Sequence, residues 1–537
     1  MLCKVYCACC NGLEVTTVTV EVNVTDGIQF HLVGLPDSAV KESQQRIESA
    51  LQCNGYRFPG KRITINLAPA NIRKEGSSFD VPLAIGILCA SGQLDDERDL
   101  NSGKRTIGER LKDFVILGEL ALDGSLREIP GALPIIIHAR EQGFKACILP
   151  SSSAMEGAEI DGIDVYAADN FTDVIDILSS EFFAKTKIVT ADDIGELEKE
   201  ENEESPDYDF SQVKGQALAK RGMEIAAAGG HNIILSGSPG SGKTFLAKCL
   251  PGILPPLTKA EAIQTSNIYS VAGLLAAESG KEHHRGGLLR NRPFRSPHHT
   301  ITVPALIGGG NRGLPGEISL AHNGVLFCDE FAEFDRRSIE VLRQPLEDGV
   351  VQISRVKGKH FYPARFMLVA AMNPCPCGHL LDGFGKCKCS SSSILKYRSK
   401  ISGPVMDRID IQIRVRPVSA DELVFSSPGK EETSATVAER VRKAREIQYR
   451  RFSQAGESFF TNAAITPSKL NTYCKLPYNQ NEVMQTIIRQ KGISARGYSR
   501  ILKIARTIAD LEGSEQIDIA HIAEAINLRC PDKNEMI

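Results

Sequence analysis

The chain of 537 residues is 42% apolar and 24% charged, and its formal net charge is −3. This length exceeds one ordinary core, so we expect two to four domains. The charge balance neither requires nor excludes a nucleic-acid partner, because only local basic patches decide phosphate binding. Every apolar run is shorter than the roughly 18 residues of a membrane helix, so we expect no membrane partner.

The amino-terminal sequence shows no apolar stretch followed by a small-residue cleavage site, as a secretory signal would require. Fifteen cysteines in such a chain indicate reduced thiols rather than a disulfide framework. We therefore expect a cytoplasmic protein.

Residues 1–185 alternate between strand-like and helix-like patterns, which predicts an α/β domain with its own core. The apolar run 81–90 fits either a buried strand or a buried helix. Period-two or short apolar runs predict strands, and apolar residues at helical spacing predict a helix over 37–53. The expected strands are 15–24, 63–67, 115–117 and 147–149.

An acidic run separates this region from the rest, and we interpret residues 186–209 as a solvated linker. Residues 210–415 have the pattern of a second α/β domain. Residues 416–537 are expected to form a helical domain that includes helices over 435–454 and 496–512.

A complete G-x-x-x-x-G-K-[ST] pattern begins at Gly237, after an apolar strand-like segment and before a helix-like one. In such a loop, backbone N–H groups and a helix amino terminus surround phosphates, while the lysine neutralises the β- and γ-phosphates. The threonine hydroxyl is a ligand for Mg²⁺. The residues expected to bind ATP are Gly237, Ser238, Pro239, Gly240, Ser241, Gly242, Lys243 and Thr244.

Two further apolar strands end in polar side chains. The strand before Asp329 and Glu330 predicts that Asp329 holds Mg²⁺ and that Glu330 is the general base for the attacking water. The strand 366–373 ends at Asn373, which we expect to orient that water or contact the γ-phosphate. The alternative is a turn asparagine before Pro374.

Several motifs resemble the Mg-chelatase-like AAA+ ATPases of the competence-related ComM/YifB type, over almost the whole chain. They are residues 213–216, 224–232, 251–256, 292–300, 315–324 and 371–378, with 33–37, 66–70 and 74–80 in the first domain. The resemblance implies a Lon-protease/S5-like (ChlI-type) first domain, a P-loop AAA+ core and a helical lid.

The same resemblance implies a homohexameric ring with ATP between subunits. Within the segment 402–410, Arg408 matches an arginine finger that reaches the neighbouring subunit's γ-phosphate, which stabilises charge on the transferred group. Arg496 matches a second sensor at the start of a lid helix, and Arg500 competes for that role. The alternative for either finger or sensor is a surface ion pair of little energetic value.

A Lon-type protease needs a serine activated by a lysine. Ser78 lies at the matching place, but the stretch 129–134, where the lysine is expected, contains none. We therefore interpret the first domain as a non-proteolytic scaffold or partner-binding module.

Two basic segments are candidates for contact with a DNA backbone, since lysine and arginine bind phosphates without reading bases. One is an insertion, and the other is the tip of a predicted hairpin, with Gly358 as its turn; a solvated loop is the alternative. We interpret His298 and His299 as supports of the fold or of a subunit contact. The basic residues are His283, His284, Arg285, Arg290, Arg292 and Arg295 in the insertion, and Arg355, Lys357 and Lys359 in the hairpin.

Four thiols within fifteen residues suit a structural Zn²⁺, although their C-x-C spacing is tighter than usual. Free thiols or a redox pair remain alternatives. These cysteines are Cys375, Cys377, Cys387 and Cys389. A second group within a predicted strand is interpreted as plain thiols, namely Cys3, Cys7, Cys9 and Cys10.

Two functions are compatible with these patterns. The resemblance implies an ATP-driven helicase or branch-migration factor that acts on single-stranded or branched DNA, alongside recombination proteins. The alternative is a chelatase-like or chaperone-like ATPase that remodels a protein partner.

Overall fold

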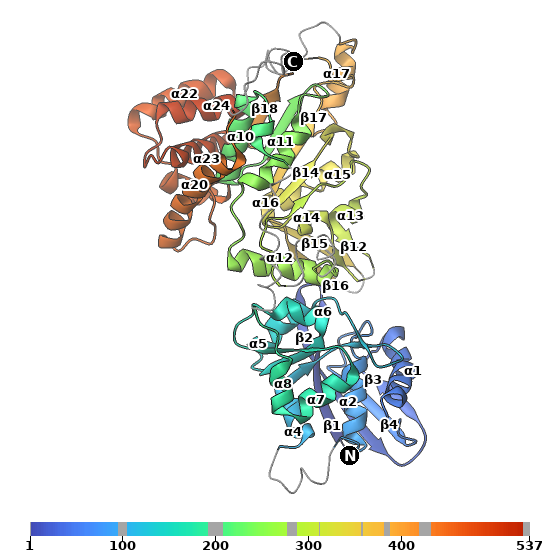
Figure 1. The fold of residues 1–537 in the computed structure, drawn as a ribbon. Coiled ribbons are helices and arrows are strands. Elements are labelled where there is room, and N and C mark those ends of the chain that lie inside the picture. Colours follow the sequence, from blue (N-terminus) through green and yellow to red (C-terminus); the bar gives the residue numbers. More distant parts are fainter. Residues whose placement is uncertain are drawn as a thin grey trace.

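The computed structural model describes residues 2–94, 105–191, 208–275, 287–310, 312–355, 358–380, 387–417 and 431–529. Most of the acidic run predicted as a linker lies outside these residues. The predicted α/β class is confirmed, with an amino-terminal sheet, a parallel sheet in the middle of the chain and a helical carboxyl-terminal region (Figure 1).

The amino-terminal region contains a mixed sheet of seven strands in the order β3-β4-β2-β1-β5-β8-β9. All four strands expected from sequence lie in it. Its strands are β1 (Leu2–Asn11), β2 (Glu14–Thr25), β3 (Phe30–Val33), β4 (Arg62–Ala68), β5 (Phe114–Ile116), β8 (Ala146–Pro150) and β9 (Asp164–Ala168). The helices that matter below are α1 (Ser38–Cys53), α2 (Asp80–Ala90) and α5 (Ala132–Glu141).

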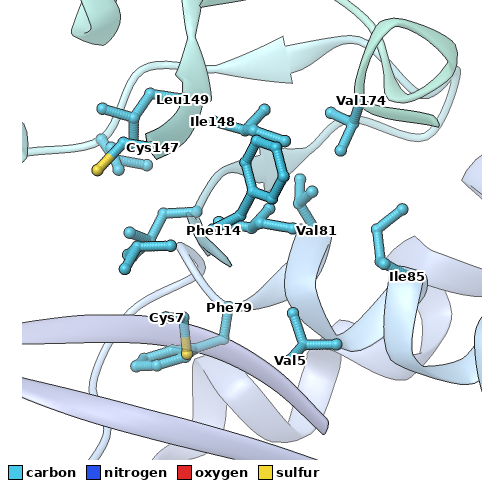
Figure 2. Packing of buried hydrophobic residues seen from close by; sticks show 14 of the residues in the cluster. Val5, Cys7, Phe79, Val81, Ile85, Phe114, Cys147, Ile148, Leu149 and Val174 are labelled. Carbon is cyan, nitrogen blue, oxygen red and sulfur yellow. The ribbon is translucent and has the colours of Figure 1, made fainter. Parts of the chain in front are cut away.

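The apolar run 81–90 forms the helix α2, in which every residue is buried. A helix that is apolar on all sides must lie inside a core, and α2 packs against β1, β2 and α1. Figure 2 shows Val81 and Ile85 of this helix among side chains of β1, β5 and β8. Gly86 allows the close approach, because a Cβ there would lie 2.6 Å from Val22 Cγ2.

The amino-terminal core is shared with the next region rather than separate, which the sequence did not predict. Ile268 and Tyr269 of α12 (Lys259–Ala272) belong to the same buried cluster as α2 and the first sheet. The backbone N–H of Gly131 donates to the Ser270 carbonyl at 2.9 Å. Helix α12 therefore joins the two regions, and Figure 1 shows it between them.

The second sheet is parallel throughout, in the order β11-β14-β17-β10-β18. Both of its faces are covered, which explains why β14 and β17 consist of buried residues along their whole length. Its strands are β11 (Phe294–Arg295), β14 (Val325–Cys328), β17 (Met367–Met372), β10 (Ile233–Gly237) and β18 (Ile411–Val415).

The carboxyl-terminal helices cover one face of this sheet. Ile504 and Ile508 of α23 share a buried cluster with Ile233 and Ile411 of the sheet. The two helices expected from sequence are confirmed as α20 (Ser434–Gln454) and α23 (Ala495–Leu511), and α24 (Ile519–Arg529) packs beside α23. Within the described residues, no helix combines the length and apolarity needed to cross a membrane.

The predicted hairpin is also present, as β15 (Val350–Arg355) paired with β16 (Gly358–Pro363). The prediction that Gly358 forms the turn is wrong. Gly358 is the first residue of β16 and pairs with Arg355, so the connection consists of the two residues between them. Lys357 lies in that connection, outside the described residues.

Candidate functional site

Strand β10 leads into a glycine-rich loop over 237–242, which is followed by helix α11 (Lys243–Cys249). Gly240 and Gly242 have φ values of 76° and 87°, a backbone region that other residues rarely adopt. A Cβ at either position would meet no heavy atom within 4 Å, so the space over the loop is open. The loop can therefore admit a ligand against its backbone.

Lys243 is the buried cation of this loop, with 8% of its surface exposed. Its Nζ donates to the carbonyls of Gly237 at 2.7 Å and Ser238 at 2.9 Å. Nζ also lies 3.3 Å from Asn373 Oδ1, which links the loop to the end of β17. Burial lowers the pKa of Lys243, and the nearby Asp329 carboxylate opposes that shift.

The acid pair follows β14 at the same edge of the sheet. The Thr244 hydroxyl donates to Asp329 Oδ2 at 2.7 Å, although 85 residues separate the two in sequence. A hydroxyl beside a carboxylate provides the hard oxygen ligands that Mg²⁺ prefers, so the chemistry of this donor pair fits the metal. The structure thus brings together the predicted Mg²⁺ ligands, Thr244 and Asp329, with Lys243 and Asn373.

Glu330 is exposed beside this pair and has an unusual backbone, with φ of 51°. Its N–H donates to Asp329 Oδ1 at 2.9 Å, and its Oε2 lies 3.2 Å from His299 Nδ1. His299 was expected only to support the fold or a subunit contact. Its proximity to Glu330 could not be found from sequence, because the two lie on different connections of the sheet.

The three predicted arginines lie in different surroundings. Arg408 is 8% exposed, donates to the Pro404 carbonyl at 2.7 Å and pairs with Glu347. Burial lowers its pKa, and the cationic Arg343, Arg496 and Arg500 add to the shift. Among the described residues, no hydrogen bond links the Arg408 side chain to the phosphate loop 237–242; its bonds go to Pro404 and Glu347.

Arg496 is exposed in the first turn of α23, whereas Arg500 pairs with the buried carboxylate of Asp410. Asp410 also accepts the N–H of Asn232 at 3.0 Å. Burial raises the pKa of Asp410, but the Arg500 guanidinium and the His231 side chain outweigh it and lower that pKa well below the ordinary value. Arg500 therefore ties the helical region to the sheet. This contact leaves Arg496 as the better sensor candidate.

The four cysteines expected to bind zinc lie together after β17. Their sulfur atoms are all within 4.8 Å of one another. Cys375 Sγ lies 3.4 Å from Cys377 Sγ and 3.7 Å from Cys387 Sγ. The backbone N–H of His379 is the main cause that lowers the pKa of the Cys377 thiol to about 6.

The four amino-terminal cysteines form no such group among the described residues. Cys3 and Cys7 are buried on one face of β1, and the interpretation as plain thiols stays a prediction.

The basic residues proposed for DNA contact differ in availability. Arg292 pairs with Glu261 at 2.9 Å and donates to the Asn323 carbonyl at 2.7 Å, while Arg295 pairs with Glu317 at 2.8 Å. These contacts support the fold around α12 and β11. Lys359 of the hairpin is exposed, and the side chain of Arg355 is not described.

Of the other basic residues in the insertion, the structure describes only Arg290. Arg290 pairs with Glu159 at 2.9 Å. This ion pair is a further contact between the segment that joins α12 to β11 and the amino-terminal region. His283, His284 and Arg285 lie outside the described residues.

Ser78 is half-buried, and its carbonyl accepts the N–H of Gly118 at 3.0 Å. A buried lysine that the sequence search did not consider, Lys74, lies four residues earlier and donates to the Pro69 carbonyl. Its pKa is lowered by burial. The ammonium group is thus bound to backbone, and no contact between Lys74 and Ser78 is seen.

Known protein families resemble this chain over most of its length. Three family models match successive parts of the chain: "Subunit ChlI of Mg-chelatase" over 20–153, "Magnesium chelatase, subunit ChlI" over 209–423, and "Magnesium chelatase, subunit ChlI C-terminal" over 431–529.

Similar proteins extend over almost the whole chain. "Competence protein ComM" of Haemophilus influenzae is 41% identical over 98% of this chain and 97% of its own length. "Uncharacterized protein YifB" of Salmonella typhimurium is 38% identical over 97% and 96%. "Magnesium-chelatase 38 kDa subunit" of Acidiphilium rubrum is 23% identical over 59% and 87%. The chain therefore belongs to the magnesium chelatase ChlI family of AAA ATPases, and within it to the ComM/YifB type.

Proposed function

We propose that this ATPase is a motor that acts on DNA, as a helicase or branch-migration factor in recombination or natural transformation. The observation that carries the ATPase part of the proposal is the meeting of Thr244, Asp329, Lys243 and Asn373 at one sheet edge, with a hydroxyl-to-carboxylate distance of 2.7 Å. The DNA substrate is supported by the printed name of the Haemophilus relative and by the hairpin surface.

The residues of the site have separate tasks in this proposal. Lys243 exchanges the carbonyls of Gly237 and Ser238 for phosphate oxygens when ATP binds. Thr244 and Asp329 hold Mg²⁺, which neutralises charge on the phosphates when bound. Glu330 accepts the proton of the attacking water.

Asn373 orients the attacking water, because its amide lies beside the lysine that marks the phosphate position. Arg496 contacts phosphate from the helical region. The Arg408 side chain bonds to Glu347 and Pro404 and, among the described residues, not to the phosphate loop of its own chain, which supports a role toward the ATP of a neighbouring subunit. The proposal therefore includes a ring, with six subunits as the family resemblance implies.

The outer face of the β15–β16 hairpin supports contact with single-stranded DNA. Along β16 the side chains alternate, so that Lys359 and Phe361 are exposed while His360 and Tyr362 are buried. Phe361 is 52% exposed, an unusual position for a phenylalanine. A cation for phosphates beside an aromatic ring for base stacking is the combination that non-specific single-strand binders use.

The proposal divides the chain into the same four regions that the sequence predicts. Residues 1–185 form a non-proteolytic support, 186–209 a linker, 210–415 the ATPase core and 416–537 the lid. The close contact between Gly131 and α12 indicates that the support is attached to the core rather than tethered loosely.

ATP turnover with and without branched DNA tests the proposal. Lys243→Ala should abolish ATP binding or turnover, and Glu330→Gln should bind ATP but lose about 10²-fold or more in turnover. Single-stranded or branched DNA should stimulate the wild type at low salt, where electrostatic binding is strongest. Absence of any DNA effect under those conditions would refute the DNA motor.

The hairpin is tested by the double variant Lys359→Ala, Phe361→Ala. It should retain basal turnover and lose DNA stimulation. Lys41→Ala is the matched control, because Lys41 is an exposed lysine on α1, in another domain. Equal DNA stimulation in the hairpin variant and this control would show that the hairpin does not bind DNA.

A chelatase-like or chaperone-like ATPase that remodels a protein partner is the second candidate. It is favoured by the match of residues 209–423 to the magnesium chelatase subunit model. Recovery of one stoichiometric protein partner that stimulates turnover, together with no response to DNA, would support it over the DNA motor.

A further inference from the structure

We propose that one structural Zn²⁺ is bound by four cysteines, Cys375, Cys377, Cys387 and Cys389. The metal holds the segment from Asn373 to Gly378 in position beside the phosphate loop. The coupling to the ATP site rests on the function proposed above, whereas the metal site itself does not.

The sulfur separations, from 3.4 Å between Cys375 and Cys377 up to 4.8 Å across the set, lie on both sides of the edge length of a tetrahedral zinc centre. Four sulfurs at a Zn–S distance of about 2.3 Å form a tetrahedron with edges of about 3.8 Å. Cys375 Sγ and Cys377 Sγ each lie 3.7 Å from Cys387 Sγ, and the whole set lies within 4.8 Å. A disulfide requires about 2.05 Å between sulfurs, so the cysteines are arranged around a common centre rather than in bonded pairs.

The surrounding backbone brings the two C-x-C pairs together. The first pair follows the end of β17 at Met372, and the N–H of Gly378 donates to the Cys375 carbonyl at 3.0 Å, which closes a turn. The second pair precedes α17 (Ser391–Arg398), whose first turn is capped by Ser390. Four protein thiols leave no open coordination position, which is the pattern of a structural site rather than a catalytic one.

The cluster lies directly against the ATP site. Asn373, whose amide contacts Lys243, is two residues before Cys375. Gly378 packs on the phosphate loop so closely that a Cβ there would lie 2.5 Å from Pro239 Cδ. Helix α17 contacts the segment that carries the first cysteine pair, since Arg398 Nε donates to the Pro374 carbonyl at 3.3 Å.

Through these contacts, a bound metal would fix the position of Asn373 in the ATP site. The segment from Asn373 to Gly378 has neither helix nor strand hydrogen bonds, so its position depends on a few contacts, such as Arg398 to the Pro374 carbonyl, and on the cysteines. Zn²⁺ would fix the segment at its middle, and with it both the Asn373 amide and the wall against Pro239. Loss of the metal would release the amide that positions the attacking water, so turnover should fall more than ATP affinity.

The first experiment measures metal content in the full-length protein by mass spectrometry. The wild type should contain one zinc per chain, and Cys387→Ser and Cys389→Ser should contain none. Cys53→Ser is the matched control, because Cys53 is an exposed cysteine at the end of α1. Equal zinc content in the control and in both cluster variants would overturn the proposal.

The second experiment uses wild-type protein, so it does not depend on the folding of a variant. Zinc is removed with a chelator under reducing conditions, and Co²⁺ is added as a spectroscopic probe. One equivalent of Co²⁺ should produce the visible absorption bands of a tetrahedral cobalt–thiolate centre, and Zn²⁺ should displace them. Failure of the reduced protein to bind either ion would refute the site.

The effect on the ATP site is measured on the same samples. Zinc removal should lower kcat at least about tenfold, with a smaller change in ATP affinity, and Zn²⁺ but not Mg²⁺ should restore it. Stoichiometric zinc with unchanged kcat after removal would refute the positioning role. A protein that binds zinc but never hydrolyses ATP would instead refute the proposed function and leave the metal site established.

Discussion

Glu156 provides a test of the contact between the amino-terminal region and the ATPase core. It lies in the short 3₁₀ helix η2 (Met155–Gly157) and is 3% exposed. Its Oε2 accepts the Ser270 hydroxyl of α12 at 2.5 Å and the N–H of Leu133 at 2.9 Å. Burial raises the pKa of Glu156 from 4.5 to about 7, despite both hydrogen bonds.

The magnitude follows from the difference between the folded and unfolded pKa values. Ionisation at high pH costs the folded state about 3 kcal/mol, since each pKa unit corresponds to about 1.4 kcal/mol. The cost is absent below pH 4.5, where Glu156 is protonated in both states. It grows between pH 4.5 and 7 and is complete above pH 7. Removing the charge should therefore stabilise the protein at high pH and have little effect at low pH.

The variant Glu156→Gln keeps the shape and the acceptor oxygen but cannot ionise. Denaturant unfolding should show it more stable than wild type by about 3 kcal/mol at pH 8 and by about 1 kcal/mol at pH 5. The control is Glu141→Gln, at an exposed glutamate on α5, which should show no such dependence. A stability difference that is the same at both pH values, or a less stable variant at pH 8, would refute the reasoning.

Three further variants test the site. Arg408→Ala should bind ATP normally but lose about 10³-fold in turnover, and normal turnover would contradict the finger assignment. His299→Ala should lower kcat about tenfold with little change in ATP affinity, because the variant removes the partner of Glu330. An unchanged kcat would show that His299 does not position Glu330. Asp410→Asn should destabilise the fold by about 3 kcal/mol, measured by denaturant unfolding, because Arg500 loses its charged partner; equal stability would contradict that role.

The elements around the phosphate loop could be predicted because their determinants are local. The strand, the loop and the first turn of α11 follow from a continuous sequence in which apolar residues, glycines and Lys243 occur in order. The strands that lead to Asp329 and Asn373 were predictable for the same reason, since buried parallel strands consist of uninterrupted apolar residues. Parallel topology then places all three carboxyl ends at one edge of the sheet.

Contacts between distant segments could not be predicted in this way. No pattern relates His299 to Glu330, or Arg500 to Asp410, because each pair depends on how separate connections pack. The shared core was missed for a similar reason. The apolar residues of helix α12 do not show from sequence which region they pack against, so the contact of Tyr269 with the amino-terminal core could not be predicted.

The position of the hairpin suggests why an amino-terminal region that lacks a visible catalytic pair is attached to an ATPase. The turn between β1 and β2 touches the back of the hairpin, since a Cβ at Gly12 would lie 3.1 Å from His360 Nδ1 and 3.2 Å from Tyr362 Oη. Tyr362 Oη also donates to the Gly313 carbonyl at 2.9 Å, which anchors the same buried face to the core. The opposite face carries Lys359 and Phe361.

A two-stranded hairpin alone is only marginally stable in water, so its buried face needs such support to hold the exposed face in one orientation. The amino-terminal region would then act on DNA indirectly, by fixing the hairpin. This explanation requires that Gly12→Val, which forces a side chain between the two surfaces, weakens DNA stimulation without changing basal ATP turnover. Full DNA stimulation in that variant would show that the hairpin keeps its orientation without the amino-terminal region.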